Sequence, residues 1–76
     1  MKEVTYLKIP FGTLKRLNNY AVNGFASGSD EAKTYWEDRI VTACSVLYDC
    51  GCLNANERAE VSLYFRTYVY FGRGVI

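Results

Sequence analysis

Two glycine-containing breaks divide this chain into three apolar segments. The first break reads NGFASG at residues 23–28, and the second reads DCGCLN at residues 49–54. Glycine directly after a periodic apolar run commonly ends a helix, because it enters the left-handed conformation without steric cost. A chain of 76 residues buries only about 60% of its unfolded surface, which leaves room for one core. We therefore expect three short elements packed as a single helical domain over residues 1–76.

The first segment predicts a short arm followed by a helix. Residues 1–10 have no clear period, and Pro10 disfavours helix at the residue before it, so we expect an extended arm up to about residue 10. The next apolar positions recur at the spacings of three and four that mark one face of a helix: Leu14, Leu17 and Ala21. With Asn23 and Gly24 as the stop signal, this helix covers about residues 12–23.

The second segment has the clearest helical pattern in the chain. Ser29 can cap a helix, and Asp30 and Glu31 in the first turn interact favourably with the helix dipole. The apolar stripe then advances by four, three, four and three residues through Trp36, Ile40, Ala43, Leu47 and Cys50. These signals predict a helix over about residues 30–50. Glu37 and Asp38 lie off the stripe, on a face that we expect to be solvated.

The third segment begins with the signature of a capping box. Asn54 is followed three residues later by Glu57, so each side chain can bond the other residue's backbone N–H. The aromatic and branched residues of LYFRTYVYF also allow a strand, but the cap, the length and the short DCGC linker favour a helix over about residues 55–71. We expect its core face to consist of Val61, Tyr64, Tyr68 and Phe71. We expect Phe65 and Tyr70 to lie at the surface.

Together these elements predict an all-α protein. We expect a small three-helix bundle with a short extended N-terminal arm, in which the second and third helices form an antiparallel hairpin through the glycine turn. No apolar run has the length that a secretory leader or a membrane span requires, so we expect a cytoplasmic protein with no membrane partner.

Residue types that carry catalysis or bind metals are scarce. The chain contains no histidine, which removes the commonest general acid or base near neutral pH and the triads that depend on it. Cys44, Cys50 and Cys52 are one ligand short of a structural zinc site. A helix C-terminus also disfavours the thiolate that redox chemistry requires. We therefore expect no enzymatic activity, no cofactor and no metal, with Cys44 in the core and the other two cysteines in the turn.

The charges of the chain are segregated although they sum to only +1. Residues 1–28 carry four bases and one acid (+3), residues 29–60 carry three bases and seven acids (−4), and residues 61–76 carry two bases (+2). Domains that bind nucleic acid over most of their surface are usually strongly basic, unlike this chain. The segregation favours docking of the basic and acidic parts on each other, on a second copy, or on a partner of mixed charge.

The rings and arginines of SLYFRTYVYFGRG, residues 62–74, exceed what the core face of one small helix can bury. Surplus apolar surface marks interfaces, and tyrosine and arginine are enriched there. We expect a non-enzymatic interaction module that binds another macromolecule, namely a protein, and forms a homodimer through the third helix. Domains of this size are frequent among phage and mobile-element accessory proteins that inhibit or redirect a host protein, and we expect this chain to be one of them. The predicted partner-binding residues are Phe65, Arg66, Tyr70, Arg73, Glu37 and Asp38.

The alternative function is binding of nucleic acid. Arginines among aromatic rings can hold phosphates and stack on bases, as they do in proteins that bind single strands. The residues predicted for this role are Lys8, Lys15, Arg16, Arg66 and Arg73. The third segment is too apolar for the recognition helix of a helix-turn-helix protein, so we expect such binding to be weak and strongly dependent on salt.

Overall fold

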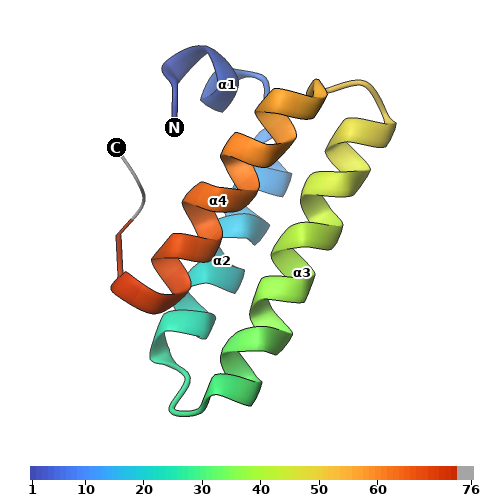
Figure 1. Cartoon of the computed structure of the whole chain (residues 1–76). Coiled ribbons are helices and arrows are strands. Elements are labelled where there is room, and N and C mark those ends of the chain that lie inside the picture. Colours follow the sequence, from blue (N-terminus) through green and yellow to red (C-terminus); the bar gives the residue numbers. More distant parts are fainter. Residues whose placement is uncertain (74–76) are drawn as a thin grey trace.

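The computed structural model describes residues 1–73 and contains four helices and no strand in that range. The three longer helices each pack against the other two, and successive ones run in opposite directions (Figure 1). The predicted all-α class is therefore confirmed. The helices are α1 (Glu3–Leu7), α2 (Phe11–Ala26), α3 (Asp30–Asp49) and α4 (Ala55–Phe71).

The N-terminal arm is helical, which corrects the prediction of an extended arm. Residues Glu3–Leu7 form α1, and Pro10 is the N-cap of α2. A helix of five residues is too short to be stable in isolation. Contacts with the rest of the chain therefore hold α1 in place, and these contacts bury Thr5 and Ile9. Local sequence patterns do not report such contacts, which is why the prediction failed.

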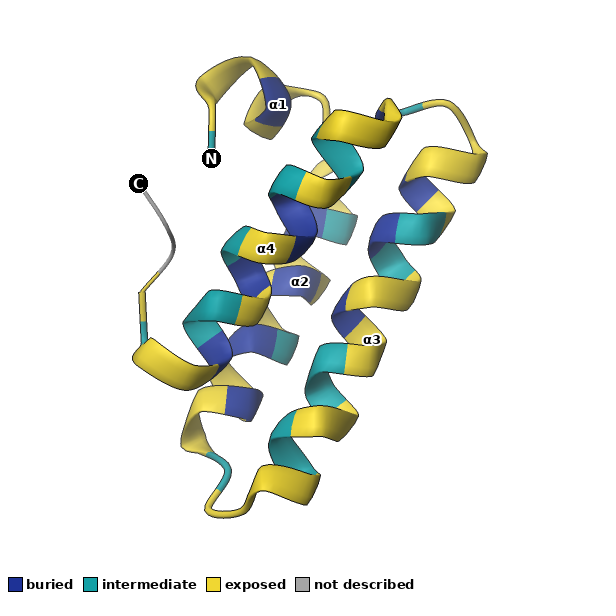
Figure 2. Ribbon diagram, viewed as in Figure 1, coloured by how far each residue is buried: buried dark blue, intermediate teal, exposed yellow. Residues whose placement is uncertain are grey.

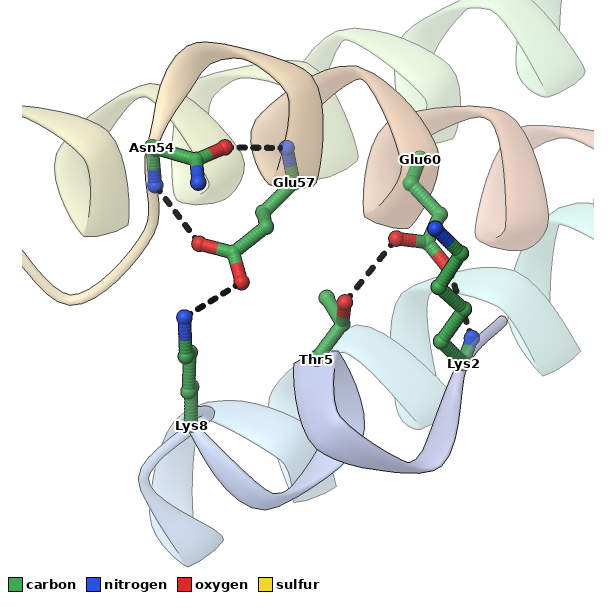
Figure 3. Close-up of polar contacts among 6 residues, drawn as sticks. All are labelled: Lys2, Thr5, Lys8, Asn54, Glu57 and Glu60. Carbon is green, nitrogen blue, oxygen red and sulfur yellow. Dashed lines mark hydrogen bonds and ion pairs between the residues drawn. The ribbon is translucent and has the colours of Figure 1, made fainter.

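Two carboxylates on α4 hold α1 in place (Figure 3). Glu60 accepts hydrogen bonds from the backbone N–H of Lys2 (2.6 Å) and from the Thr5 hydroxyl (2.9 Å). Glu57 pairs with the Lys8 ammonium at 2.6 Å. The pKa of the Glu57 carboxyl is lowered, first by the Asn54 N–H and then by Lys8, and the pKa of Glu60 is lowered chiefly by the N–H of Lys2. The first ten residues are thus joined to α4 by acids whose charged form is favoured in the fold.

The helix caps that the sequence predicts are present. The Ser29 side chain accepts a hydrogen bond from the N–H of Ala32, and Asn54 and Glu57 form a complete capping box. Each cap satisfies N–H groups that have no partner within their own helix. The starts of α3 and α4 are therefore determined by residues in their own first turns.

The helix α2 continues past its predicted stop, because Gly24 lies inside it. This glycine is buried, and α2 ends at Ala26. A Cβ atom placed on Gly24 would lie 2.8 Å from Cγ2 of Val69 on α4 and 3.1 Å from Cβ of Trp36 on α3. Gly24 thus permits a close approach of three helices, and the sequence feature interpreted as a helix stop is a packing feature.

The core is an aliphatic and aromatic cluster between the three long helices (Figure 2). Its largest fully buried side chains are Phe65, Leu17, Ile40, Val61, Val69 and Cys44. From the predicted stripes, Leu14, Leu17, Ala21, Ile40 and Leu47 are buried. Residue Cys50, predicted on the same stripe of α3, is exposed in the turn.

Of the four residues predicted for the core face of α4, only Val61 is fully buried. Val61, Phe65 and Val69, spaced by four residues, point inward, and Phe65 is only 1% exposed, so its predicted surface location is wrong. Phe71, predicted in the core, is 71% exposed. Because rings surround α4, its sequence alone does not show which rings face the other helices. Tyr64 and Tyr68 are half-buried at the edge of the core.

The substitution Gly24→Ala tests the close approach of the helices. We expect overpacking to outweigh the better helix propensity of alanine and to lower the free energy of unfolding by about 1–2 kcal/mol. Urea denaturation followed by circular dichroism measures this change. The matched control is Gly12→Ala, because a Cβ atom at Gly12 in α2 meets nothing within 4 Å. The free energy of unfolding of the control should rise by up to about 1 kcal/mol. An equal rise in Gly24→Ala would contradict the close packing at Gly24.

The loss of folding stability at acidic pH tests the contact between α1 and α4. Both glutamates have a folded-state pKa below the ordinary value of 4.5. Their contribution is therefore complete above the unfolded pKa and is lost as pH falls through the lower folded pKa. We expect the double variant Glu57→Gln, Glu60→Gln to lose less stability than wild type between about pH 5 and about pH 3. Thermal unfolding across this range is the measurement.

The control for the acid experiment is Glu31→Gln. Glu31 is exposed in the first turn of α3, and its carboxylate forms no hydrogen bond or ion pair within residues 1–73. The stability that Glu31→Gln loses on acidification should be closer to the wild-type loss than the loss of the double variant is. If stability depended on pH in the same way in wild type, the double variant and Glu31→Gln, the glutamates of α4 would not stabilise the fold through their charge.

Candidate functional site

Part of the predicted partner surface is a polar junction between α3 and α4. The Glu37 carboxylate accepts a hydrogen bond from the Arg66 guanidinium at 3.1 Å, and its other oxygen accepts one from the Tyr70 hydroxyl. The bond to Glu37 is the main reason that the pKa of Tyr70 is raised. These three predicted residues are therefore brought together, but their polar groups bind one another.

The other predicted residues are dispersed. Phe65 is in the core, Arg73 is exposed just beyond the end of α4, and Asp38 lies on the side of α3 that faces α2. In the alternative nucleic-acid set, Lys8 is paired with Glu57 and Arg66 with Glu37. Lys15 and Arg16 are exposed on α2. The partner set does not form one continuous surface, because Phe65 is buried.

A groove between α2 and α3 combines residues from both predicted sets. Its volume is about 530 Å³, and it contains Arg16 from the nucleic-acid set and Asp38 from the partner set. The two helices approach each other along one edge of the bundle, and the groove follows that edge. The lining residues are Thr13, Arg16 and Tyr20 from α2 and Tyr35, Asp38, Arg39, Thr42, Ala43, Val46 and Leu47 from α3.

One lining residue, Arg39, contacts two tyrosine rings of this groove. The Arg39 guanidinium lies 5.0 Å from the ring centroid of Tyr20 and 5.6 Å from that of Tyr35, and it donates a 3.2 Å hydrogen bond to the Tyr35 hydroxyl. Trp36 supports both rings, at centroid distances of 6.0 Å from Tyr20 and 5.0 Å from Tyr35. The pKa of Arg39 is raised, first by its polar interaction with Tyr20 and then by the nearby Tyr35. The guanidinium is thus fixed in position and charged.

The charges of the groove are not neutralised by ion pairs. Arg16 and Arg39 are both exposed, and neither forms an ion pair with any residue of 1–73. The two ion pairs in that range are Lys8 with Glu57 and Arg66 with Glu37, and both involve α4. A ligand in the groove would therefore meet two cationic groups free to bind an anionic group, beside aromatic surface.

The lining residues Tyr20, Tyr35 and Arg39 were not among the predicted site residues. One signal was available, since Tyr35 and Arg39 lie four residues apart, off the apolar stripe of α3. Tyr20 belongs to another helix, so its contact with Arg39 depends on how the helices pack. The sequence could therefore suggest the contact between Tyr35 and Arg39 within one helix. It could not suggest the contact between Tyr20 and Arg39, which lie on different helices.

Comparison of the chain with protein-family models, curated proteins and solved structures gave no significant match. Within residues 1–73, none of the helices has both the length and the apolar character required to cross a bilayer. The same range contains no group of three or more His, Cys, Asp or Glu side chains that could hold a metal ion. Function is therefore inferred from the geometry of the groove.

A double-mutant cycle on Glu37 and Tyr70 tests whether the α3–α4 junction is structural. We expect Glu37→Ala and Tyr70→Phe each to lower the midpoint of thermal unfolding by a few degrees, because each removes one partner of the same hydrogen bond. The double variant should lose less than the sum of the two single losses. The neighbouring Asp38→Asn is the control, since Asp38 is exposed and forms no ion pair in residues 1–73. Additive losses would show that the two side chains do not stabilise each other.

Proposed function

We propose that this chain is a non-enzymatic binding module that holds an acidic segment of a partner protein in the α2/α3 groove. The observation that carries the proposal is the pair of arginines, Arg16 and Arg39, which line an aromatic groove without carboxylate partners in residues 1–73. The proposal assigns the missing partners to a second molecule.

The aromatic wall supplies affinity. Tyrosine, tryptophan and arginine are the residues most enriched among those that dominate the binding energy of protein interfaces. The rings of Tyr20 and Tyr35 each contact the ring of Trp36, so little side-chain entropy remains to be lost when a ligand covers them. Val46, which is 58% exposed, adds apolar surface within the same groove.

The two arginines supply specificity for a carboxylate. A guanidinium forms paired hydrogen bonds with a carboxylate, and the contacts with the rings of Tyr20 and Tyr35 restrict where the Arg39 guanidinium can lie. Asp38 in the same lining repels a uniformly acidic ligand and favours one of mixed charge. A groove of about 530 Å³ lies within the size range of sites that bind small ligands, so it suits a few side chains of a peptide.

Binding is proposed rather than catalysis because of the chemistry of the lining. Its ionisable groups are two arginines, two tyrosines and one aspartate. Arginine stays protonated in proteins and tyrosine ordinarily ionises near pH 10, so the lining is poor in groups that exchange protons near neutral pH. The absence of histidine from the sequence agrees with this assignment.

Homodimerisation through α4 stays a prediction. The large apolar side chains of α4 that are exposed within residues 1–73 are Leu63, Tyr70 and Phe71, and the Tyr70 hydroxyl is bonded to Glu37. We therefore base the proposal on the groove. Light scattering over a range of protein concentration tests the dimer separately.

Nucleic-acid binding is the weaker alternative. Two of its five predicted cations, Lys8 and Arg66, are already paired with carboxylates, and the net charge of the chain is only +1. Phosphate binding depends on several free cations acting together. Fluorescence anisotropy with a labelled single-stranded oligonucleotide at low and high salt measures this activity directly.

Selection from a displayed library of random peptides on the immobilised full chain tests the proposal. We expect enriched peptides to combine an aspartate or glutamate with an aromatic or large aliphatic residue. Calorimetry with a synthetic peptide from the selection should show that Arg39→Ala weakens binding about tenfold or more, because Arg39 is a lining cation held by two aromatic rings. Arg16→Ala should weaken binding in the same direction.

The matched control is Arg66→Ala. Arg66 is also an exposed arginine, but it is bonded to Glu37 away from the groove, so its loss should leave peptide affinity unchanged. Selected peptides without acidic residues, or equal losses for Arg39→Ala and Arg66→Ala, would overturn the proposal. Circular dichroism of each variant establishes that the fold is retained.

A further inference from the structure

The turn between α3 and α4 brings two cysteine sulfurs together. The Sγ atoms of Cys50 and Cys52 lie 3.5 Å apart, within the range of a sulfur hydrogen bond. Gly51 between them has a φ of 83°, in the left-handed region that glycine enters readily. The N–H of Cys52 donates to the carbonyl of Leu47 (2.9 Å), and the N–H of Gly51 donates to that of Tyr48 (3.1 Å). These bonds form a Schellman motif, which holds the two cysteines on a fixed backbone.

The third cysteine is separated from this pair by burial. Cys44 is 1% exposed, and burial raises the pKa of its thiol to about 11. Cys50 is exposed, whereas Cys52 is half-buried against the core. Only the pair in the turn therefore combines access to solvent with a neighbouring thiol.

We propose that Cys50 and Cys52 form a redox-active dithiol that a low-molecular-weight disulfide, such as oxidised glutathione, converts into an intramolecular disulfide. The two sulfurs must approach by roughly 1.5 Å to reach the length of an S–S bond. Neither side chain is locked in the core, so side-chain rotation can supply this movement. The inference does not depend on the function proposed for the groove.

The reaction proceeds by two successive exchanges. The Cys50 thiolate attacks one sulfur of the oxidised reagent, which forms a mixed disulfide and releases one thiolate that takes up a proton. Cys52 then loses its proton, and its sulfur attacks Sγ of Cys50 and expels the second thiolate, which is also protonated. One protein dithiol is thus oxidised to a disulfide, and one reagent disulfide is reduced to two thiols.

The environment of the pair favours Cys50 as the first nucleophile. Cys50 is the more exposed of the two, and the pKa of Cys52 is raised, first by its hydrogen bond with Cys50. The helix C-terminus disfavours the thiolate and slows the first exchange, as the sequence suggested. The second exchange is intramolecular, and the short distance between the sulfurs accelerates it. The bond would join two cysteines that are separated by one residue in a surface turn. Exposed disulfides of this kind are labile and form and break reversibly.

Equilibration of the full chain with glutathione tests the proposal. Samples are incubated in ratios from fully reduced to fully oxidised, quenched with a maleimide under denaturing conditions, and analysed by intact mass and peptide mapping. We expect the wild type to fall from three reactive cysteines to one without retaining glutathione, and dithiothreitol to restore all three. The mapped bond should join Cys50 and Cys52.

Matched variants show whether the two sulfurs act as a pair. Cys50→Ser and Cys52→Ser replace a thiol with a hydroxyl of similar shape, and each leaves one cysteine in the turn. We expect Cys52→Ser to accumulate the mixed disulfide with glutathione at least about tenfold more than wild type, because the resolving sulfur is absent. Cys44→Ala should form the Cys50–Cys52 bond as wild type does.

Three results would overturn the proposal. The wild type would retain glutathione as much as Cys52→Ser does, or keep both cysteines of the turn reactive in oxidised glutathione alone, or form covalent dimers in place of the internal bond. Circular dichroism of the two serine variants distinguishes a missing resolving thiol from a misfolded chain. Glutathione exchange does not involve the groove, so failure here leaves the peptide-binding proposal standing.

Discussion

The fold depends on a close approach of three helices that only a residue without a side chain permits. A Cβ atom added at Gly24 of α2 would lie 2.8 Å from Cγ2 of Val69 on α4 and 3.1 Å from Cβ of Trp36 on α3. At the same place the Lys33 ammonium donates to the carbonyls of Gly24 (3.0 Å), Phe25 (3.2 Å) and Val69 (3.2 Å). One cation from α3 thus satisfies carbonyls near the C-terminal ends of both other helices, where the helix dipole favours positive charge. Small size at Gly24 and charge at Lys33 together hold this end of the bundle closed.

This packing gives α3 two different flanks. On the side of α4, Glu37 is bonded to Arg66 and Tyr70, so the polar groups are used within the fold. On the side of α2, Arg39 stacks on tyrosine rings and forms no ion pair within residues 1–73. The first flank stabilises the bundle, whereas the second leaves a charged groove accessible to another molecule. This difference, more than the number of aromatic residues, distinguishes structural rings from rings available for binding.

The turn between α3 and α4 shows how one local motif can have two consequences. The left-handed Gly51 allows the chain to reverse direction after α3 and supports the bonds that end that helix. The same reversal places Sγ of Cys50 and Sγ of Cys52 within 3.5 Å of each other. The dipole at a helix C-terminus argues against a reactive thiolate, but it does not reveal how close a second sulfur lies. We therefore propose a redox-active pair because the two sulfurs are close, although the helix dipole disfavours the thiolate.

The sequence by itself determined the elements that depend on neighbouring residues. The helical class, the caps at Ser29 and Asn54 and the apolar stripe of Leu14, Leu17 and Ala21 all follow from interactions within a few residues, and all are present. Tertiary structure decided the features that require two helices to be placed together. It made α1 helical through contacts with Glu57 and Glu60.

Tertiary structure also selected among residues that the sequence left equivalent. It buried Phe65 and exposed Phe71, although both are aromatic residues of the same helix. It brought Tyr20 to Arg39 across the groove, a contact between residues nineteen positions apart. The physical reason is that burial and cation–π stacking depend on the relative rotation and spacing of whole helices. No local periodicity encodes that relation when apolar residues surround a helix on most sides.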